Sequence, residues 1–130
     1  MCVFCSIINR EIPSEILYED EDVIAILDIS QVTYGHTLVM PKKHVADFLH
    51  ADDTTVTKCM LTARDLAARI VRKTGAAGVN ILTNCGEAAG QSVSHMHIHI
   101  IPRYDETDAI DLHFGQSGIR DLKEVHAALE

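Results

Sequence analysis

Histidine and apolar residues alternate along one short segment, VSHMHIHII (93–101), and this alternation limits how the chain can fold. Successive side chains of a β-strand point to opposite faces, with about 3.3 Å between neighbouring residues. His95, His97 and His99 therefore share one face of a strand, and the apolar residues between them share the other. Only the apolar face can be buried against a helix, so the sequence predicts a sheet whose histidine face is turned toward solvent or a cleft.

Three neighbouring imidazoles need a chemical explanation, because a solvated sheet face normally carries residues such as Thr, Lys, Glu and Ser. One explanation is a metal site built from several imidazoles. The other is phosphate chemistry, in which one imidazole attacks and others hold charge. The preceding loop, CGEAAGQS (85–92), combines glycines with small hydroxyl and amide side chains. This composition suits a phosphate cradle, although a plain hairpin connection would look similar.

A long amphipathic helix is predicted in the middle of the chain. Apolar residues recur there at spacings of three and four: Val56, Cys59 or Met60, Ala63, Leu66 and Ile70. Asp52, Asp53 or Thr54 can cap its start, and Gly75 can adopt the left-handed conformation that ends a helix. Cys59 belongs to the apolar stripe and is expected in the core.

Four other segments have the β-branched, apolar composition of strands: 16–20, 22–29, 36–40 and 79–84. The first two predict a hairpin around an acidic turn. Pro41 and Pro102 are expected to end the strands that precede them, and a short final helix is predicted after Ser117. Because the strands dominate the middle and the helices stand apart from them, we predict an α+β fold with a mostly antiparallel sheet.

Length and charge exclude several classes of function. The chain has 130 residues, which fits a single domain, and 11 basic against 19 acidic residues give a net charge of −8. Such a charge disfavours nucleic acid and anionic membranes as partners, and no stretch approaches the roughly 20 apolar residues of a membrane span. The first residues lack the basic and continuous apolar regions of a signal peptide, so we expect a cytoplasmic protein.

Together these motifs resemble the histidine-triad (HIT) family, whose signature is His-x-His-x-His-x-x with x hydrophobic. The matching residues are His95 to Ile101, CxFCxII at 2–8, Glu11-Ile12-Pro13, Asp28-Ile29, Gly35-His36, Pro41-Lys42-Lys43-His44 and Gly90-Gln91-Ser92. The resemblance defines a histidine-triad domain at 1–104, and 105–130 are expected to form a tail with a short helix in the same single domain. It implies a five-stranded antiparallel sheet, one long helix, and a homodimer joined through its sheets.

The resemblance also implies a nucleotide phosphoramidase-like hydrolase. Such an enzyme attacks the α-phosphate of a purine nucleotide conjugate and forms a covalent nucleotidyl-histidine intermediate. His97 would be the nucleophile, because a neutral imidazole has a free lone pair at pH 7. Its other ring nitrogen must then donate to a fixed acceptor, which is a backbone carbonyl in the family. His99 and His36 would line the phosphate site, and Ser92 would hydrogen-bond the leaving atom.

Residues for nucleotide binding follow from the same resemblance. Asp28 would hydrogen-bond the ribose hydroxyls, and the backbone around Gly90 and Gln91 would assist Ser92. Asn84 stands where Hint-like phosphoramidases carry Asn and Fhit-like dinucleoside polyphosphate hydrolases carry Gln, which favours the Hint-like branch. The base of AMP, GMP or a conjugate would lie against Phe4, Ile7, Ile26, Leu27 and Ile29. Of these, the isoleucines at 26 and 29 could equally be ordinary core residues.

A structural zinc ion is the expected cofactor. Cys2 and Cys5 form a Cys-x-x-Cys pair, which supplies half of a tetrahedral zinc site. In the zinc-bearing members of the family that this chain resembles, the other two ligands correspond to His44 and His95. The ion would tie the N-terminal segment to the strand that carries His97. The alternative for the pair is two reduced, half-buried thiols.

Other functions remain open at this stage. The chain could be a dinucleoside polyphosphate hydrolase of the Fhit type, a nucleotide-binding adaptor with incidental hydrolysis, or a metalloenzyme with zinc at His97 or His99. Cys85 precedes the predicted phosphate loop without a partner that would activate it. The histidines without a surrounding motif are expected on the surface: His50, His113 and His126.

Overall fold

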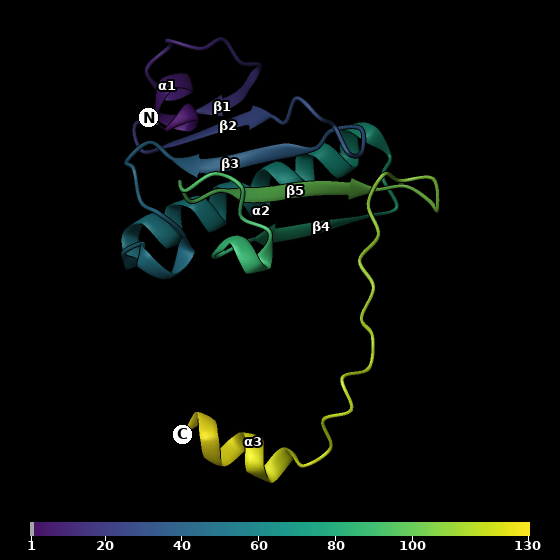
Figure 1. The fold of residues 1–130 in the computed structure, drawn as a ribbon. Coiled ribbons are helices and arrows are strands. Elements are labelled where there is room, and N and C mark those ends of the chain that lie inside the picture. Colours follow the sequence, from purple (N-terminus) through teal and green to yellow (C-terminus); the bar gives the residue numbers. More distant parts are fainter. Residues whose placement is uncertain (1) are drawn as a thin grey trace.

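The computed structural model describes residues 2–130, in which five strands form one antiparallel sheet in the order β1-β2-β3-β5-β4. The strands are β1 (Ile16–Glu19), β2 (Val23–Leu27), β3 (Thr37–Pro41), β4 (Gly78–Thr83) and β5 (Ile98–Arg103). The helices are α1 (Val3–Ile8), α2 (Asp53–Thr74) and α3 (Leu122–Leu129), with short 3₁₀ turns η1 (Phe48–His50) and η2 (Glu87–Ala89). Figure 1 shows α2 behind the sheet and α1 beside β1 and β2. The predicted α+β class and antiparallel sheet are confirmed.

Helix α2 begins and ends at the predicted signals. The Asp52 side chain accepts a hydrogen bond of 2.8 Å from the Thr55 N–H, which satisfies one of the free donors of the first turn. Gly75 adopts φ 73°, and its N–H donates to the Val71 carbonyl. Cys59 lies fully buried on the apolar stripe, as predicted.

The sheet has an apolar core on each face. On the α2 side, the buried residues include Val23, Ala25, Val39, Ala63, Leu66, Ile70, Met96, Ile98 and Ile100. On the α1 side, they are Phe4, Ile7, Ile24, Ile26, Leu38 and Met40. The apolar face of the 93–101 segment therefore packs on the long helix, as its alternation predicts, and the histidines lie on the face that α1 covers.

The bounds of the histidine strand differ from the prediction at both ends. Pairing with β3 begins only at Ile98, so His95 and His97 precede the strand, although the alternation of faces continues through them. At the other end, β5 continues through Pro102 to Arg103. A proline is tolerated there because the β3 ladder stops at Ile100, so Pro102 has a strand neighbour only on the β4 side.

Helix α1 was not predicted, because six residues give too short a window for a helical period. Its start is stabilised by the Cys2 side chain, which accepts a hydrogen bond from the Cys5 N–H. Phe4 and Ile7 are buried on its inner face. The Cys-x-x-Cys pair therefore lies on the first turn of a helix that covers the histidine face.

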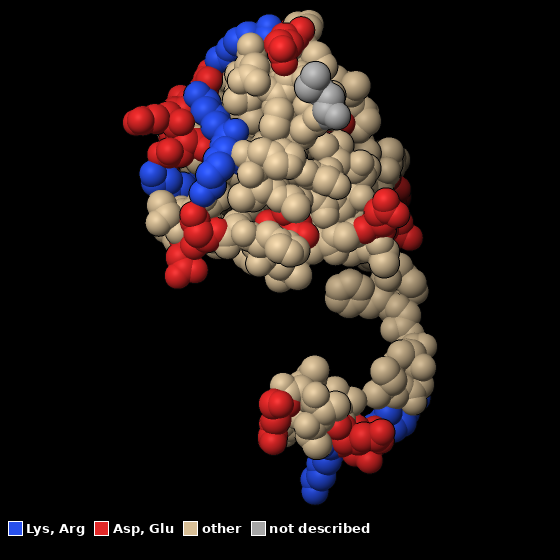
Figure 2. Space-filling view, turned by 60° about the vertical axis from the view of Figure 1, so that its left-hand side comes forward, with Lys and Arg blue, Asp and Glu red and all other residues tan. Residues whose placement is uncertain are grey.

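The chain leaves the domain after Ile110. Up to that point it is held by a 2.9 Å ion pair between Arg103 and Asp108 and by a hydrogen bond from the Ala109 N–H to the Val32 carbonyl. Every residue from 111 to 130 is exposed, and Figures 1 and 2 show this arm extending away from the domain to α3. Among residues 2–130, no helix is long and apolar enough to span a membrane.

Candidate active site and metal centre

A cavity of about 420 Å³ lies between α1, the end of β2 and the histidine segment. This volume falls in the range of roughly 300 to 1,000 Å³ typical of small-molecule sites. The predicted site residues that line it are Phe4, Ile7, Ile26, Leu27, Asp28, Ile29, Ser92, His97 and His99. The cavity therefore combines apolar side chains with two imidazoles, a hydroxyl and a carboxylate.

Two of the predicted base-contacting residues differ in their surroundings. Ile26 is 3% exposed and belongs to the core under α1, so it serves both core and cavity. Ile29 is fully exposed at 101% and stands at the cavity rim, so the alternative of a core residue is wrong for it.

His97 is held in a single tautomer by the backbone. Its Nδ1 lies 2.7 Å from the carbonyl oxygen of His95, which can only accept, so Nδ1 carries the proton. Nε2 is left with a free lone pair. The side chain is 5% exposed, and Phe4 packs edge-on against the ring with the centroids 4.9 Å apart. Burial lowers the pKa of His97, although the hydrogen bond to the His95 carbonyl opposes the shift.

His36 is not among the residues that line the cavity, contrary to the expectation that it lines the phosphate site. It is 3% exposed and lies behind His99, with its Nε2 3.0 Å from His99 Nδ1. The Asp28 carboxylate is 3.8 Å from the same Nε2. Burial raises the pKa of Asp28, but hydrogen bonds from Ser30 and the neighbouring histidines outweigh it, so that the net shift is downward.

The predicted phosphate loop is held together by its own hydrogen bonds. The Gly90 N–H donates to the Glu87 carbonyl and the Gln91 N–H to the Gly86 carbonyl, so neither amide is free for a ligand. The Gln91 side chain accepts from the Gly86 N–H and donates to two backbone carbonyls. Asn84 donates to the Gly90 carbonyl and lies outside the cavity lining. These residues shape the loop that presents Ser92, which is the residue of this group that lines the cavity.

Several cavity residues were not predicted as site residues: Val3, Ile12, Pro13, Ser14, Leu38 and Val93. The motif Glu11-Ile12-Pro13 drew attention to the segment after α1, but nothing in its pattern showed that the segment turns toward the cavity. Leu38 alternates with its neighbours along β3, and its face could be assigned only once the faces covered by α1 and α2 were known.

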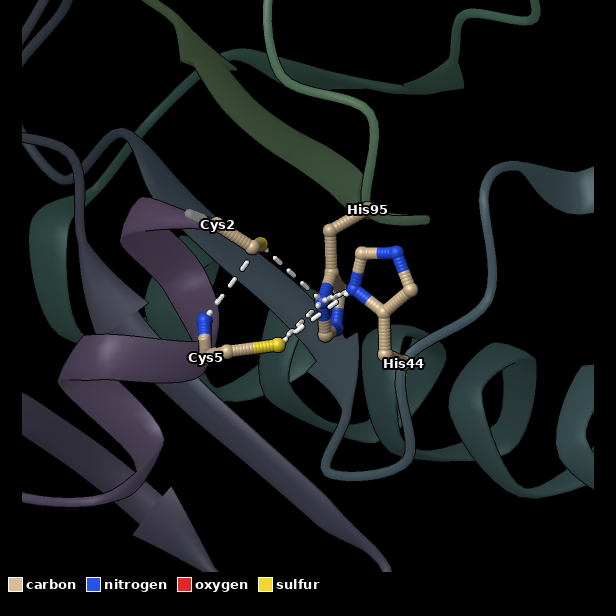
Figure 3. Close-up of side chains that lie close together, drawn as sticks. All are labelled: Cys2, Cys5, His44 and His95. Atoms are coloured by element: carbon tan, nitrogen blue, oxygen red, sulfur yellow. Dashed lines mark hydrogen bonds between the residues drawn. The ribbon is translucent and has the colours of Figure 1, made fainter.

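Cys2, Cys5, His44 and His95 come together in a second cluster, whose ligand atoms all lie within 4.8 Å of one another. Figure 3 shows Cys2 just before α1, Cys5 on α1, His44 on the loop after β3 and His95 on the histidine segment, with their side chains converging. The Nδ1 atoms of the two histidines are 3.2 Å apart. Cys5 Sγ is 3.3 Å from His44 Nδ1 and 3.6 Å from His95 Nδ1.

These distances fit a tetrahedral zinc site. Zinc bonds of about 2.3 Å to sulfur and about 2.05 Å to nitrogen give tetrahedral edges of about 3.4 Å between nitrogens and about 3.6 Å between nitrogen and sulfur. His95 Nε2 is 2.8 Å from the Pro41 carbonyl, so Nε2 carries the proton and Nδ1 directs its lone pair at the cluster. The donor set, its spacing and this outer hydrogen bond all suit Zn²⁺.

His95 connects the two clusters. Its Nδ1 faces the cysteines, while its backbone carbonyl accepts the hydrogen bond that fixes His97. The side chain is fully buried. Anything that shifts His95 therefore shifts the acceptor on which the His97 tautomer depends.

Comparison with known proteins agrees with this geometry. A family model of the HIT domain matches residues 9–106. An uncharacterized HIT-like protein of Methanocaldococcus jannaschii is 46% identical over 125 residues, which cover 96% of this chain and 95% of that protein. The adenylylsulfatase HINT3 of Arabidopsis thaliana is 41% identical over 102 residues, which cover 78% of this chain and 52% of that protein.

A solved structure shares the whole fold. The crystal structure of a HIT family member from Bacillus subtilis superimposes with a TM-score of 0.92 at 41% identity, covering 98% of this chain and 94% of that one. Such coverage includes most of the arm as well as the sheet. With the histidine segment, the cavity beneath α1 and the family match in agreement, the chain belongs to the HIT family.

Proposed function

We propose that the protein is a nucleotide phosphoramidase-like hydrolase that uses His97 as a covalent nucleophile. The observation that carries this proposal is the 2.7 Å hydrogen bond from His97 Nδ1 to the His95 carbonyl, which leaves a free lone pair on Nε2. His97 lines a nucleotide-sized cavity together with Ser92 and Asp28. The adenylylsulfatase relative also cleaves a nucleotide conjugate, as its name states, which supports this class of substrate.

In the first step, the lone pair of His97 Nε2 attacks the α-phosphorus of a nucleotide joined to an amine. A bond forms between Nε2 and phosphorus as the bond from phosphorus to the amine nitrogen breaks, and the amine leaves with that electron pair and takes up a proton. The ring becomes positively charged, and the His95 carbonyl opposite Nδ1 stabilises that charge. Ser92 is placed to hydrogen-bond the leaving nitrogen.

In the second step, water attacks the nucleotidyl group. The new bond from oxygen to phosphorus replaces the bond to Nε2, which regains its lone pair, and the proton lost by water passes to solvent. The products are the amine and the nucleoside monophosphate, and His97 returns to its starting state. Asp28, which also lines the cavity, would hydrogen-bond the ribose hydroxyls, and the apolar lining residues would contact a purine.

We also propose that Cys2, Cys5, His44 and His95 hold a structural Zn²⁺. Such an ion would fix α1 against the histidine segment and take no part in the chemical steps. Because all four protein ligands complete the tetrahedron, the site leaves no open position for a substrate or water. The hydrogen bond from His97 Nδ1 to the His95 carbonyl leaves Nε2 able to bind a metal as well as to attack phosphorus, so trapping the nucleotidyl-histidine is what separates this proposal from a metalloenzyme with zinc at His97 or His99.

The proposed activity predicts which substrate is hydrolysed fastest. We expect adenosine 5′-phosphoramidate to be cleaved with a kcat/KM at least about tenfold above that of a diadenosine polyphosphate, a difference of about 1.4 kcal/mol in transition-state binding. Release of AMP is measured by chromatography with the purified chain, and adenosine 5′-phosphosulfate is run in parallel.

The other outcomes distinguish the alternatives. A higher kcat/KM for the dinucleotide would assign the Fhit-like activity and overturn the inference drawn from Asn84. Tight AMP binding without turnover of any of these substrates would favour a nucleotide-binding adaptor.

We propose a homodimer in which the arm of each copy packs on the other. Ile119, Leu122 and Leu129 are exposed, as is Phe114 at 95%. Residues 122, 125 and 129 lie on one face of α3, and an isolated helix of eight residues is not stable in water. Because the B. subtilis structure covers 98% of this chain, most of the arm has a counterpart there too. The edge strand β4 offers a second surface for joining two sheets.

The arm predicts a sharp difference between two neighbouring substitutions. Leu122→Asp places a charge on the apolar face of α3, whereas Lys123→Asp places the same charge one residue further on, outside that face. We expect the first to raise the dimer dissociation constant roughly 100-fold, since two leucines are lost from the interface, and the second to leave it within about threefold. Light scattering after size exclusion measures the mass. A wild-type monomer, or equal effects of the two substitutions, would contradict this role of the arm.

A further inference from the structure

His36 is a buried imidazole beside the cavity, and the two-step mechanism gives it no role. It is 3% exposed and absent from the cavity lining, so it cannot touch a bound nucleotide. Its Nε2 lies 3.0 Å from Nδ1 of His99, a residue that does line the cavity. The two rings are stacked with centroids 5.2 Å apart. His36 can therefore affect the reaction through two neighbours that do line the cavity: His99, which its Nε2 contacts at 3.0 Å, and the more distant Asp28 carboxylate at 3.8 Å.

The surroundings of His36 decide which of its nitrogens carries the proton. Nδ1 is buried and has no hydrogen-bond partner among residues 2–130. Nε2 faces two acceptors, His99 Nδ1 at 3.0 Å and the Asp28 carboxylate at 3.8 Å. A buried N–H without an acceptor is costlier and rarer than an unfilled lone pair. The proton therefore sits on Nε2, where it is donated to His99.

This arrangement also argues against a metal ion held by Asp28, His36 and His99, although their ligand atoms cluster. A histidine bound to a metal through Nε2 carries its proton on Nδ1 and donates it to an acceptor. The buried Nδ1 of His36 has no such acceptor among the described residues. The donor set fits a directed hydrogen bond between the two histidines better than a metal site.

We propose that His36 is a positioning residue that holds His99 in the tautomer with its proton on Nε2, so that His99 presents a hydrogen-bond donor to the substrate phosphate. The expected effect of His36 on the reaction rate rests on the hydrolase activity proposed above. The expected tautomer of His99 does not depend on that activity. When His99 Nδ1 accepts from His36, the only hydrogen left on the ring is on Nε2. His99 Nε2 is thereby fixed as a donor.

The two imidazoles of the cavity then have opposite tautomers and different tasks. His97 carries its proton on Nδ1 and offers a lone pair at Nε2, while His99 carries its proton on Nε2 and offers a donor. Their ring centroids are 5.1 Å apart. The nucleophile His97 and the hydrogen-bond donor His99 would both approach one α-phosphate. Neither could take over the other's role while the His95 carbonyl holds His97 and His36 holds His99.

Charge is not needed for this role of His99. Burial, together with the neighbouring His97 and His36, lowers the pKa of His99 to about 4, and burial also lowers the pKa of His36 despite the opposing Asp28 carboxylate. Both rings are thus neutral at pH 7, the state in which tautomers are defined. A neutral donor in a preset direction stabilises charge that develops on a phosphoryl oxygen without reorganising in the reaction.

The tautomer can be measured directly, without any assay of activity. In the full-length chain labelled with ¹⁵N-histidine, long-range ¹H–¹⁵N spectra at pH 7 distinguish a protonated from an unprotonated ring nitrogen. We expect His99 to show a protonated Nε2 and an unprotonated Nδ1 in the wild type. His36→Leu removes the donor and is expected to give a mixture of tautomers at His99, whereas His36→Gln restores the pure form because its amide can donate from a similar position.

Kinetics of the same variants test the consequence for the reaction. We expect His36→Leu to lower kcat by about 10- to 100-fold, less than the 10²- to 10³-fold typical of removing a transition-state donor outright, with KM changed less than kcat. His36→Gln should recover most of the loss. In a His99→Ala background, His36→Leu should change kcat less than about twofold, since the group on which it acts is gone. His50→Leu, the same change at an exposed histidine, is the control, and melting curves identify any variant that has not folded.

The outcomes separate this proposal from the proposed activity. If the wild type hydrolyses none of the substrates, the spectra still decide the tautomer of His99. An Nδ1-protonated His99 in the wild type, a pure Nε2 tautomer that persists in a folded His36→Leu, or an undiminished effect of His36→Leu in the His99→Ala background would each overturn the positioning role.

Discussion

His97→Ala is expected to lower kcat for adenosine 5′-phosphoramidate by at least about 10⁴-fold, because no other group can form the covalent bond to phosphorus. Among residues 2–130, His99 is the only other imidazole that lines the cavity, and its Nδ1 faces His36 Nε2 at 3.0 Å. Binding of AMP should change far less, since the apolar lining residues and Asp28 remain. Initial rates measure the first effect and calorimetric titration the second.

The intermediate itself should be visible in the wild type. Mixing enzyme with excess substrate and quenching in alkali, where a bond from phosphorus to histidine survives, is expected to add the mass of one nucleotidyl group to a peptide that contains His97. His97→Ala should show no such addition, and His50→Ala, a change at a surface histidine, should keep both the adduct and the rate. Turnover of a folded His97→Ala within tenfold of the wild type would exclude covalent catalysis by this residue.

Most of the fold prediction came from the alternation of polar and apolar residues in the histidine segment and from the capping residues of the long helix. The alternation of residues 95–100 placed Ile98 and Ile100 against α2 correctly, because a period of two leaves a strand no other way to bury its apolar side chains. Gly75 marked the end of α2 correctly, and Asp52, one of the three residues proposed as its N-cap, caps its start, because capping hydrogen bonds are local and depend on residue type. Both signals can be seen in sequence alone.

The errors came from interactions between distant segments. Whether Pro102 ends a strand depends on where β3 stops, which no local pattern reveals. The backbone around Gly90 and Gln91 was expected to assist Ser92 at the leaving atom, but the loop uses the N–H groups of both residues internally. His36 was expected to line the phosphate site, and its burial behind His99 depends on how the start of β3 pairs with β5, which no local pattern reveals. The family resemblance predicts which residues come together at the site. Their hydrogen-bond partners can be identified only from the folded structure.

Removing zinc is expected to lower the melting temperature by at least about 10 °C. Structural zinc contributes on the order of 10 kcal/mol of binding free energy in small domains, and for a chain of this size a loss of about 3 kcal/mol already corresponds to such a shift. Apart from the proposed ligands, Phe4 links α1 to the histidine segment by packing edge-on against His95 and His97, and Phe4 and Ile7 share a core with β2 and β3. Without the ion, α1 would be held against the sheet by these packing contacts and no longer by the metal.

Metal content and melting curves test this together. We expect about one zinc per chain by elemental analysis, and a much lower content and melting temperature in Cys5→Ser. Cys85→Ser is the matched control, since this cysteine lies outside the cluster and should change neither quantity. A metal-free chain that melts at the same temperature with and without added zinc would contradict a structural ion and leave the two cysteines as simple thiols.

The proposed zinc site is connected to the active site through His95. Loss of zinc should therefore impair catalysis by His97, whereas loss of the His97 side chain should not impair zinc binding. Loss of the ion frees the His95 side chain, and with it the carbonyl that keeps the proton of His97 on Nδ1. We therefore expect Cys5→Ser to reduce the rate at which the nucleotidyl-histidine forms as well as stability. His97→Ala, in contrast, should leave zinc content and melting temperature near the wild-type values, because the His97 side chain is not among the four ligands. Equal loss of zinc in Cys5→Ser and His97→Ala would show that zinc binding depends on the His97 side chain, and would contradict this one-way dependence.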